Sequence, residues 1–507
     1  MAADLGSRAS RTALGVLACA APTVATCVLL ATMFDATLLD YFPLVSDEIA
    51  YQRQIAAFVQ TGFNGGYFTA YEHPAPFAFT HFSVHGPAFP VIYGVMGRIV
   101  GWELYSGPLF NLAGLAIATA LFLVMGRLSR GQIAAAATMI LSSWWVLLMA
   151  SITMQESLNQ AVMIVMAGFA ARLMHPDTRR HGRLLLTALV VLAVASVLRP
   201  TNWIVAVPLV LVAMPRHRPR SVALATLGAA CGIPVFWLTW RYLSAPIPGL
   251  AIDWAPATGS GAIERTATYF FSHLRDNIHD VFDITEFLEA PFYQHVMFEC
   301  VAVVLGCALL IGGAWRKLAA VPLSFKVDLF NLLVLGLSLV AFLGFYFDSD
   351  ASISRVTAPF LLLSLLVLVA TRVRPWLVAG VLAANVLVAP SFLAVYREWR
   401  VDLFEYDRVR YELFRTQVTP LLAFDARRTP WCNTLLTMTY AREIVAVPAG
   451  VGLSVGRPPE RLTPPLKSGY VLLPPDSVQE FGDKAQLQHL TTTVLGELYA
   501  NRDARCD

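Results

Sequence analysis

Long apolar runs separated by short polar connections dominate the sequence. A membrane-spanning helix needs about 20 apolar residues to cross roughly 30 Å of hydrocarbon. Lipid cannot satisfy a free backbone, so each such run is expected to be a helix. The runs are 12–34, 107–126, 132–150, 158–174, 184–198, 201–214, 221–243, 294–315, 328–347, 356–371 and 376–395. The pattern therefore predicts an all-α polytopic membrane protein with about eleven transmembrane helices and additional juxtamembrane helices.

Two stretches depart from a simple span. Residues 86–102 hold Arg98 and two prolines, which fits a membrane-embedded or surface helix better than a full span. Residues 184–214 are too long for one helix and short for two, and Arg199-Pro200 stands in their middle, where proline breaks a helix. We expect a tight hairpin whose tip lies in the outer leaflet, with Arg199 at the outer face.

Positive charge gathers in every second connection. Cytoplasmic loops of membrane proteins carry the excess of Lys and Arg. The basic residues of one side are Arg8, Arg11, Arg127, Arg130, Arg172, Arg179, Arg180, Arg183, Arg216, Arg218, Arg220, Arg316, Lys317, Lys326, Arg372 and Arg374. The first run, 12–34, is longer than the core of a signal peptide, so we interpret it as a retained span. The pattern predicts a cytoplasmic N-terminus and a C-terminal tail on the opposite side.

Three long segments fall on the outer side. They are the first outer loop, 35–106, the second, 244–293, and the tail from 398, and loops of this length are usually functional. The tail mixes proline-rich turns with short β-like runs at Thr434–Thr439, Glu443–Pro448, Tyr470–Pro474 and Thr491–Leu495. We expect residues 1–397 to form a transmembrane domain and residues 398–507 a small soluble α/β domain.

Composition agrees with this class. Hydrophobic residues make up 57% of the chain and charged residues 14%, against about 25% charged residues in soluble domains. The chain has no dense Lys/Arg run interleaved with aromatic residues, which argues against nucleic acid as a partner. Of the seven cysteines, five lie in apolar runs, and Cys432 and Cys506 lie in the tail. These two form a disulfide if the tail faces an oxidising compartment, or stay free thiols; their spacing does not decide between the two.

Three carboxylates at outer helix ends are candidates for chemistry. Asp47 and Glu48 follow Ser46 at the start of an amphipathic helical pattern, and Glu156 stands at the outer junction of two spans. Acids at such positions can simply cap a helix or occupy its first turn. The alternative is a general base, or a ligand for a divalent cation such as Mg²⁺ or Mn²⁺, held at the membrane surface.

The same face carries an imidazole and several guanidinium groups. His85 precedes an apolar interfacial helix, where a histidine beside free backbone N–H groups can hold a phosphate. Arg199, Arg241 and Arg355 fall at outer helix ends. They are either snorkelling anchors or a set that binds a phosphate. Outer carboxylates and outer arginines together suggest a site for a phosphate-bearing, lipid-soluble substrate.

At these residues the chain resembles the GT-C superfamily of membrane glycosyltransferases. The likeness is to the branch of protein O-mannosyltransferases, aminoarabinose transferases and related bacterial lipopolysaccharide sugar transferases, and it covers most of residues 10–400. Asp47-Glu48 matches the Asp-Glu pair of that branch. His85-Gly86-Pro87 matches its His-Pro-Pro motif with one glycine in place of proline. Glu156 stands where an aspartate is more usual.

Two further motifs carry the same resemblance. Leu198-Arg199-Pro200-Thr201 resembles a turn that this branch often places inside a tight hairpin. Arg355, four residues before Pro359, resembles an outer arginine that precedes a proline-containing span. The motifs are short, and their order, spacing and common side of the membrane carry the likeness together.

The resemblance implies a sugar transferase that uses a polyprenyl-phosphate-linked donor. The isoprenoid chain would lie in the bilayer, and the donor phosphate would meet His85 and outer arginines. The acceptor, a glycolipid, a polysaccharide or a protein, would enter from the outer side of a bacterial inner membrane. Asp47 would be the base, and Glu48 and Glu156 would orient the acceptor or bind a divalent cation. Relatives differ in their use of a metal, so the cofactor stays open.

Two other classes of function remain. A transporter or lipid flippase usually shows inverted repeats and polar residues in broken helices near the bilayer midplane. The sequence has no such repeat, and its notable polar groups gather at one face. An inactive scaffold with the same fold, which binds partners through its tail, is the third interpretation.

Overall fold

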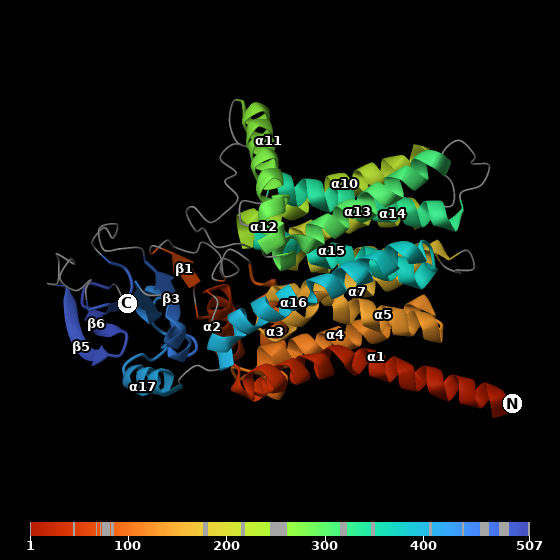
Figure 1. The fold of residues 1–507 in the computed structure, drawn as a ribbon. Helices are drawn as coiled ribbons and strands as arrows, with labels where there is room; N and C mark the ends of the chain where they lie inside the picture. Colours follow the sequence, from red (N-terminus) through yellow and green to blue (C-terminus); the bar gives the residue numbers. More distant parts are fainter. Residues whose placement is uncertain are drawn as a thin grey trace.

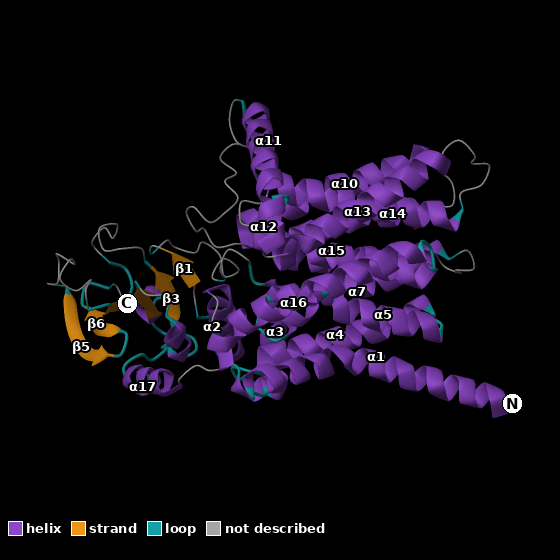
Figure 2. Cartoon of the chain, viewed as in Figure 1, coloured by secondary structure: helices purple, strands orange, loops and turns teal. Residues whose placement is uncertain are grey.

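The computed structural model shows a bundle of long helices with a small sheet at one end (Figures 1 and 2). It describes residues 2–43, 46–66, 68–70, 72, 82, 86–175, 181–213, 219–243, 261–289, 291–314, 322–345, 350–404, 408–438, 441–456, 466–475 and 486–504.

The helices follow the apolar runs of the sequence. The longer ones are α1 (Ala2–Phe34), α2 (Ser46–Thr61), α3 (Ala88–Val100), α4 (Ser106–Gly126), α5 (Arg130–Ser142), α6 (Trp144–Ala150), α7 (Gln155–Met174), α8 (His181–Leu198), α9 (Ala206–Ala213), α10 (Pro219–Leu238), α11 (Ala262–Val281), α12 (Ile284–Glu289), α13 (Pro291–Ala314), α14 (Leu323–Phe345), α15 (Asp350–Thr371), α16 (Pro375–Phe404) and α17 (Arg408–Val418). Short 3-10 segments are η1 (Leu38–Asp40), η3 (Pro200–Val205), η7 (Trp431–Asn433) and η8 (Arg442–Ala446), and η4 (Thr239–Leu243) is π-helical.

Eight helices in the described part of the chain are long and apolar enough to cross a membrane, or nine if one bent pair counts as a single span. The prediction of a mostly helical fold with apolar helices of membrane-spanning length is therefore confirmed, and the predicted number of about eleven spans is too high for these residues. The run 132–150 is the bent pair, α5 and α6, which meet at 64° around Ser143. The run 201–214 is a 3-10 turn followed by the short helix α9. A hydropathy profile gives the length of an apolar run, but it does not show where the helix within that run bends or breaks.

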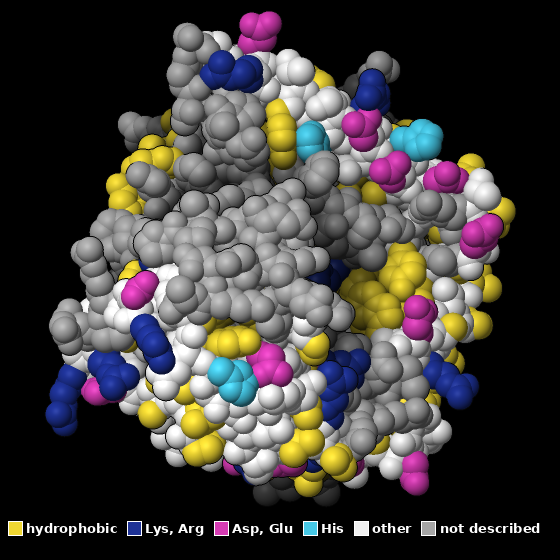
Figure 3. Space-filling view, turned by 90° about the vertical axis from the view of Figure 1, so that its left-hand side faces the viewer, with side chains coloured by type: hydrophobic (Ala, Val, Ile, Leu, Met, Phe, Trp, Pro, Cys, Tyr) yellow, Lys and Arg dark blue, Asp and Glu magenta, His cyan; other side chains and the backbone are white. Residues whose placement is uncertain are grey.

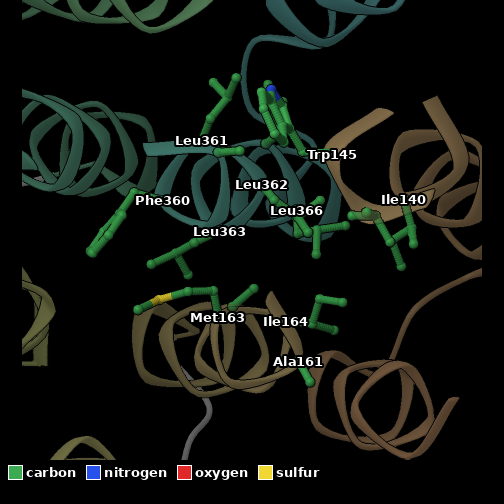
Figure 4. Packing of buried hydrophobic residues seen from close by; sticks show 14 of the residues in the cluster. Ile140, Trp145, Ala161, Met163, Ile164, Phe360, Leu361, Leu362, Leu363 and Leu366 are labelled. Atoms are coloured by element: carbon green, nitrogen blue, oxygen red, sulfur yellow. The ribbon is translucent and has the colours of Figure 1, made fainter. Parts of the chain in front are cut away.

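Helices α7 and α15 form the centre of the bundle. Most of the apolar stretch of each is buried, 78% for α7 and 83% for α15. Figure 4 shows Met163 and Ile164 of α7 beside Leu363 and Leu366 of α15. Glu156 lies near the N-terminus of α7, Arg355 lies near the N-terminus of α15, and the two side chains are in contact. The two helices therefore run in the same direction. Apolar packing in the middle thus fixes the polar residues at that end.

The sheet of the C-terminal part draws one strand from the first outer loop. Its order is β1-β3-β2-β4-β6-β5. The first four strands in this order pair in parallel, and β6 pairs antiparallel with both of its neighbours, β4 and β5. The strands are β1 (Phe68–Ala70), β2 (Thr434–Thr437), β3 (Gly452–Val455), β4 (Tyr470–Leu473), β5 (Leu487–Thr493) and β6 (Gly496–Asn501). Since β1 pairs with β3, the unit expected over 398–507 also contains part of the first loop. Acidic and basic side chains are scattered over the described surface of this end (Figure 3).

Candidate functional site

The candidate site is built around Glu156, in the first turn of α7. The glutamate is 1% exposed. Its Oε1 atom lies 3.0 Å from Nη2 of Arg199 and 3.4 Å from Nε of Arg355. A carboxylate at a helix N-terminus is also favoured by the helix dipole. Three predicted residues, far apart in the sequence, are therefore in direct contact.

The fold explains how the two arginines reach one carboxylate. Helix α8 ends at Leu198, and Pro200 opens the 3-10 segment η3, so the predicted break falls where the sequence placed it. Arg199 is the residue between the two elements, with an extended backbone. Arg355 lies in the second turn of α15, whose N-terminus adjoins that of α7. A break in one helix and the start of another thus aim two guanidinium groups at Glu156.

The cluster of Glu156, Arg199 and Arg355 carries excess positive charge. One carboxylate faces two guanidinium groups, and arginine stays protonated in proteins. Nη1 of Arg199 and Oε2 of Glu156 are buried without a hydrogen-bond partner among the described residues. A buried donor without an acceptor costs free energy. An anion that accepts from this nitrogen would restore the missing bond and balance the charge.

Asp47 lies within electrostatic reach of this cluster. It stands in the first turn of α2 and is partly buried. One turn later, Tyr51 is fully buried, and burial raises the pKa of its phenol, with further contributions from the charges of Asp47 and Glu156. The arginines at 199 and 355 act in the opposite direction on the same pKa. The charges of all four residues, Asp47, Glu156, Arg199 and Arg355, therefore act on the phenol of Tyr51. Tyr51 was not among the residues predicted from the sequence, although its place four residues after Asp47 puts it on the same helix face.

Glu48, the neighbour of Asp47 in the sequence, contacts a different group of residues. Its Oε1 atom accepts a hydrogen bond from the Tyr41 hydroxyl and another, of 2.9 Å, from the backbone N–H of Thr153. Glu48 is 0% exposed. The segment before α7 also binds Arg400, whose Nε donates to Ser151 Oγ at 3.0 Å. Glu48 thus anchors the segment that leads to Glu156, and the described contacts separate it from the arginine cluster.

His85 lies outside the described residues, as does the side chain of Arg241. Their backbone neighbours adjoin one another, because a Cβ on Gly86 would lie 3.2 Å from the carbonyl oxygen of Leu243. Gly86 has a φ of 74°, in the left-handed region that proline cannot adopt. The glycine that departs from the His-Pro-Pro motif is therefore required by this backbone.

Two further hypotheses from the sequence concern a metal ion and a disulfide bond. In the described part of the chain, no group of three or more His, Cys, Asp or Glu side chains is arranged to hold a metal ion. Glu48 and Glu156 have the separate partners given above. Cys432 is disulfide-bonded, while Cys506, the other half of the predicted pair, lies outside the described residues.

Comparison with known proteins returned no match to a family model, to a curated protein or to a solved structure. The described part of the chain is a mostly helical fold that has several helices long and apolar enough to cross a membrane, together with a small sheet. Any narrower assignment depends on the motifs and on the contacts around Glu156.

Proposed function

We propose that this protein is a membrane glycosyltransferase of the GT-C type, which moves a sugar from a polyprenyl-phosphate donor to an acceptor on the non-cytoplasmic side. The observation that carries the proposal is the contact of Glu156 with Arg199 and Arg355, with Asp47 in electrostatic range. These residues come from four separate elements and include a general-base candidate and two phosphate-binding candidates. Their proximity supports an anion-binding reaction centre better than a set of independent membrane anchors.

In the proposed reaction, Asp47 accepts the proton of an acceptor hydroxyl. The freed oxygen attacks the anomeric carbon of the sugar, and the bond between that carbon and the phosphate oxygen breaks. The electron pair leaves with the phosphate, and the anomeric configuration inverts. A positioned base contributes about 10²–10⁴-fold to such a step. Arg199 and Arg355 stabilise the negative charge that develops on the leaving phosphate.

The charges of the site suit this displacement. A phosphodiester donor has one negative charge, and the cluster of one carboxylate and two guanidinium groups has one net positive charge, which the ionised Asp47 nearby balances only until it takes the acceptor proton. After transfer, Asp47 is neutral and the lipid phosphate has gained a negative charge. Charge therefore moves from the partly exposed aspartate toward the arginines. Preorganised cations at the place where charge develops are an effective source of catalysis.

The direct test uses a short-chain polyprenyl-phosphate hexose or pentose with the protein in liposomes. We expect wild type to consume the donor and Asp47→Asn to reduce turnover by about 10²–10⁴-fold, because the amide cannot take the proton. Glu103→Gln is the matched control, since Glu103 is an exposed carboxylate of the same loop. Donor binding should be the same in all three proteins.

Two results would contradict the proposal. Full turnover in Asp47→Asn would remove Asp47 as the base. Movement of intact donor across the liposome bilayer, with no sugar transferred, would instead identify a lipid flippase. The latter remains the second candidate because the same arginines would bind a lipid phosphate in either class.

A further inference from the structure

Helix α2, which carries Asp47, is buried on two opposite sides. Tyr51 and Ile55 belong to the hydrophobic core of the helix bundle. Ile49 and Ala50 belong to a second core, shared with Phe414, Leu435, Ile444 and other residues of the C-terminal domain. A helix that is buried all round has no solvent face of its own. Its position therefore depends on the bundle and on the C-terminal domain together.

Arg53 attaches the middle of α2 to the C-terminal domain. It is 4% exposed, and its guanidinium donates to three backbone carbonyls: those of Val447, of Pro448 at 3.3 Å and of Val451 at 2.7 Å. Burial lowers the pKa of Arg53 to about 10, which still leaves it charged at neutral pH. A planar guanidinium can reach several carbonyls at once, which a lysine ammonium on a flexible stem does less well.

The chain after α2 makes a second attachment to the same domain. The N–H of Gly66 donates to the carbonyl of Gly450 at 2.7 Å. Strand β1 then pairs with β3, Phe68 opposite Leu453. Beyond the strand, the Glu72 carboxylate accepts backbone N–H bonds from Lys467 at 2.9 Å and Ser468 at 2.7 Å. The attachment therefore continues for nearly 20 residues of the first loop.

We propose that the C-terminal domain is a positioning element of the reaction centre, which holds α2 and thereby Asp47 in register with the arginines. Arg53 is the positioning residue. This inference rests on the proposed function, in which Asp47 is the base. It gives the C-terminal domain a role in the chemical step without any contact between that domain and the donor.

If the C-terminal domain holds α2, then Asp47 and the cluster of Glu156, Arg199 and Arg355 should respond differently when α2 loosens. Glu156, Arg199 and Arg355 are joined to one another and lie on segments of the bundle, so they should move less than Asp47 when α2 loosens, although Glu48 and Gln52 of α2 also contact Thr153. The base should move most. A misplacement of about 1 Å can cost roughly 10²-fold in rate. Loosening α2 should therefore lower kcat and leave the KM for the donor unchanged.

The experiment compares Arg53→Met, Arg53→Lys and the control Arg410→Met with the whole protein in liposomes. Arg410 is 57% exposed and pairs with Glu443, so the control removes an arginine of the C-terminal domain without touching α2. We expect kcat to fall by about 10²-fold in Arg53→Met, by less in Arg53→Lys, and not in the control. A rise in donor KM with kcat unchanged would overturn the proposal.

A second readout does not depend on sugar transfer. Hydrogen exchange should quicken at residues 47–52 in Arg53→Met, while the strands β2 and β4 stay protected. Unchanged exchange at 47–52, or an equal loss of protection in α2 and in the sheet, would overturn the positioning role. If wild type transfers no sugar, the proposed function fails, and hydrogen exchange still decides whether the C-terminal domain holds α2.

Discussion

Glu48 and Glu156 are buried carboxylates at the same end of the bundle, but their surroundings differ in kind. Glu48 accepts from a tyrosine hydroxyl and a backbone N–H, which are neutral donors, and one buried guanidinium, that of Arg400, lies in electrostatic range. Glu156 faces two guanidinium groups, and one of its oxygens lacks a partner among the described residues. A carboxylate held by neutral donors fixes a segment in place. A carboxylate outnumbered by cations leaves room for a second anion, so the comparison separates an anchor from a binding site.

The largest difference should follow from Glu156→Gln. The substitution leaves two largely buried guanidinium groups without their direct counter-charge, and breaking a buried ion pair costs about 3–5 kcal/mol, an upper bound here because both arginines are partly exposed. Inorganic phosphate can supply the missing negative charge, so it should stabilise this variant more than it stabilises wild type. Thermal unfolding with and without phosphate measures both effects. Equal stabilisation of the two proteins by phosphate would show that the arginines do not form an anion site.

A smaller effect is expected for Glu48→Gln, the matched substitution in the other surroundings. The amide oxygen still accepts from Tyr41 and Thr153, so the loss of stability should be about 1 kcal/mol, the range of a single hydrogen bond. Glu48→Leu removes the acceptor that the Tyr41 hydroxyl and the Thr153 N–H share, and leaves that N–H only the Tyr41 oxygen at 3.2 Å, so it should cost about 1–3 kcal/mol. Neither variant should gain stability from phosphate. A phosphate response in Glu48→Gln as large as in Glu156→Gln would erase the distinction between the two carboxylates.

The sequence predicted the residues of the arginine cluster because charge patterning assigns each helix end to one side of the membrane. Glu156, Arg199 and Arg355 were placed on the same outer face, and parallel packing of α7 and α15 then brings two of them together. The break at Arg199-Pro200 is a local property of proline and was predicted at the residue where it occurs. The helix-breaking effect of proline and the assignment of helix ends to one side of the membrane are therefore enough to predict most residues of this cluster.

The attachment of α2 could not be predicted in the same way. Arg53 and Val451 are 398 positions apart, and no local pattern connects an arginine to a distant carbonyl. Strand β1 has three residues and exists because β3 pairs with it. The run Glu443–Pro448 was predicted as a strand, yet 442–446 form a 3-10 helix. Such choices depend on packing between distant segments, which periodicity within one segment does not contain.

The smallest effect concerns Asp40, which precedes the tyrosine that binds Glu48. Its carboxylate accepts from the backbone N–H of Thr37 at 2.9 Å and from the Thr37 hydroxyl at 2.8 Å, and these bonds lower the pKa of Asp40. A lowered pKa means that the folded protein favours the ionised form, so the stabilisation is present at neutral pH. It is lost as the pH falls below about 4, the ordinary range of an aspartate.

Asp40 is exposed to solvent, so screening should limit its contribution to at most about 0.5 kcal/mol. Asp40→Asn should therefore lower the unfolding temperature slightly at pH 7, and this difference from wild type should be smaller at pH 3. The same comparison for Glu103→Gln, an exposed acid of the same loop, provides the control. A larger loss at pH 3 than at pH 7 would reverse the sign and show that Asp40 does not stabilise η1 as a carboxylate. A loss well above 0.5 kcal/mol would mean that η1 supports Tyr41, and through it Glu48, more strongly than its exposure indicates.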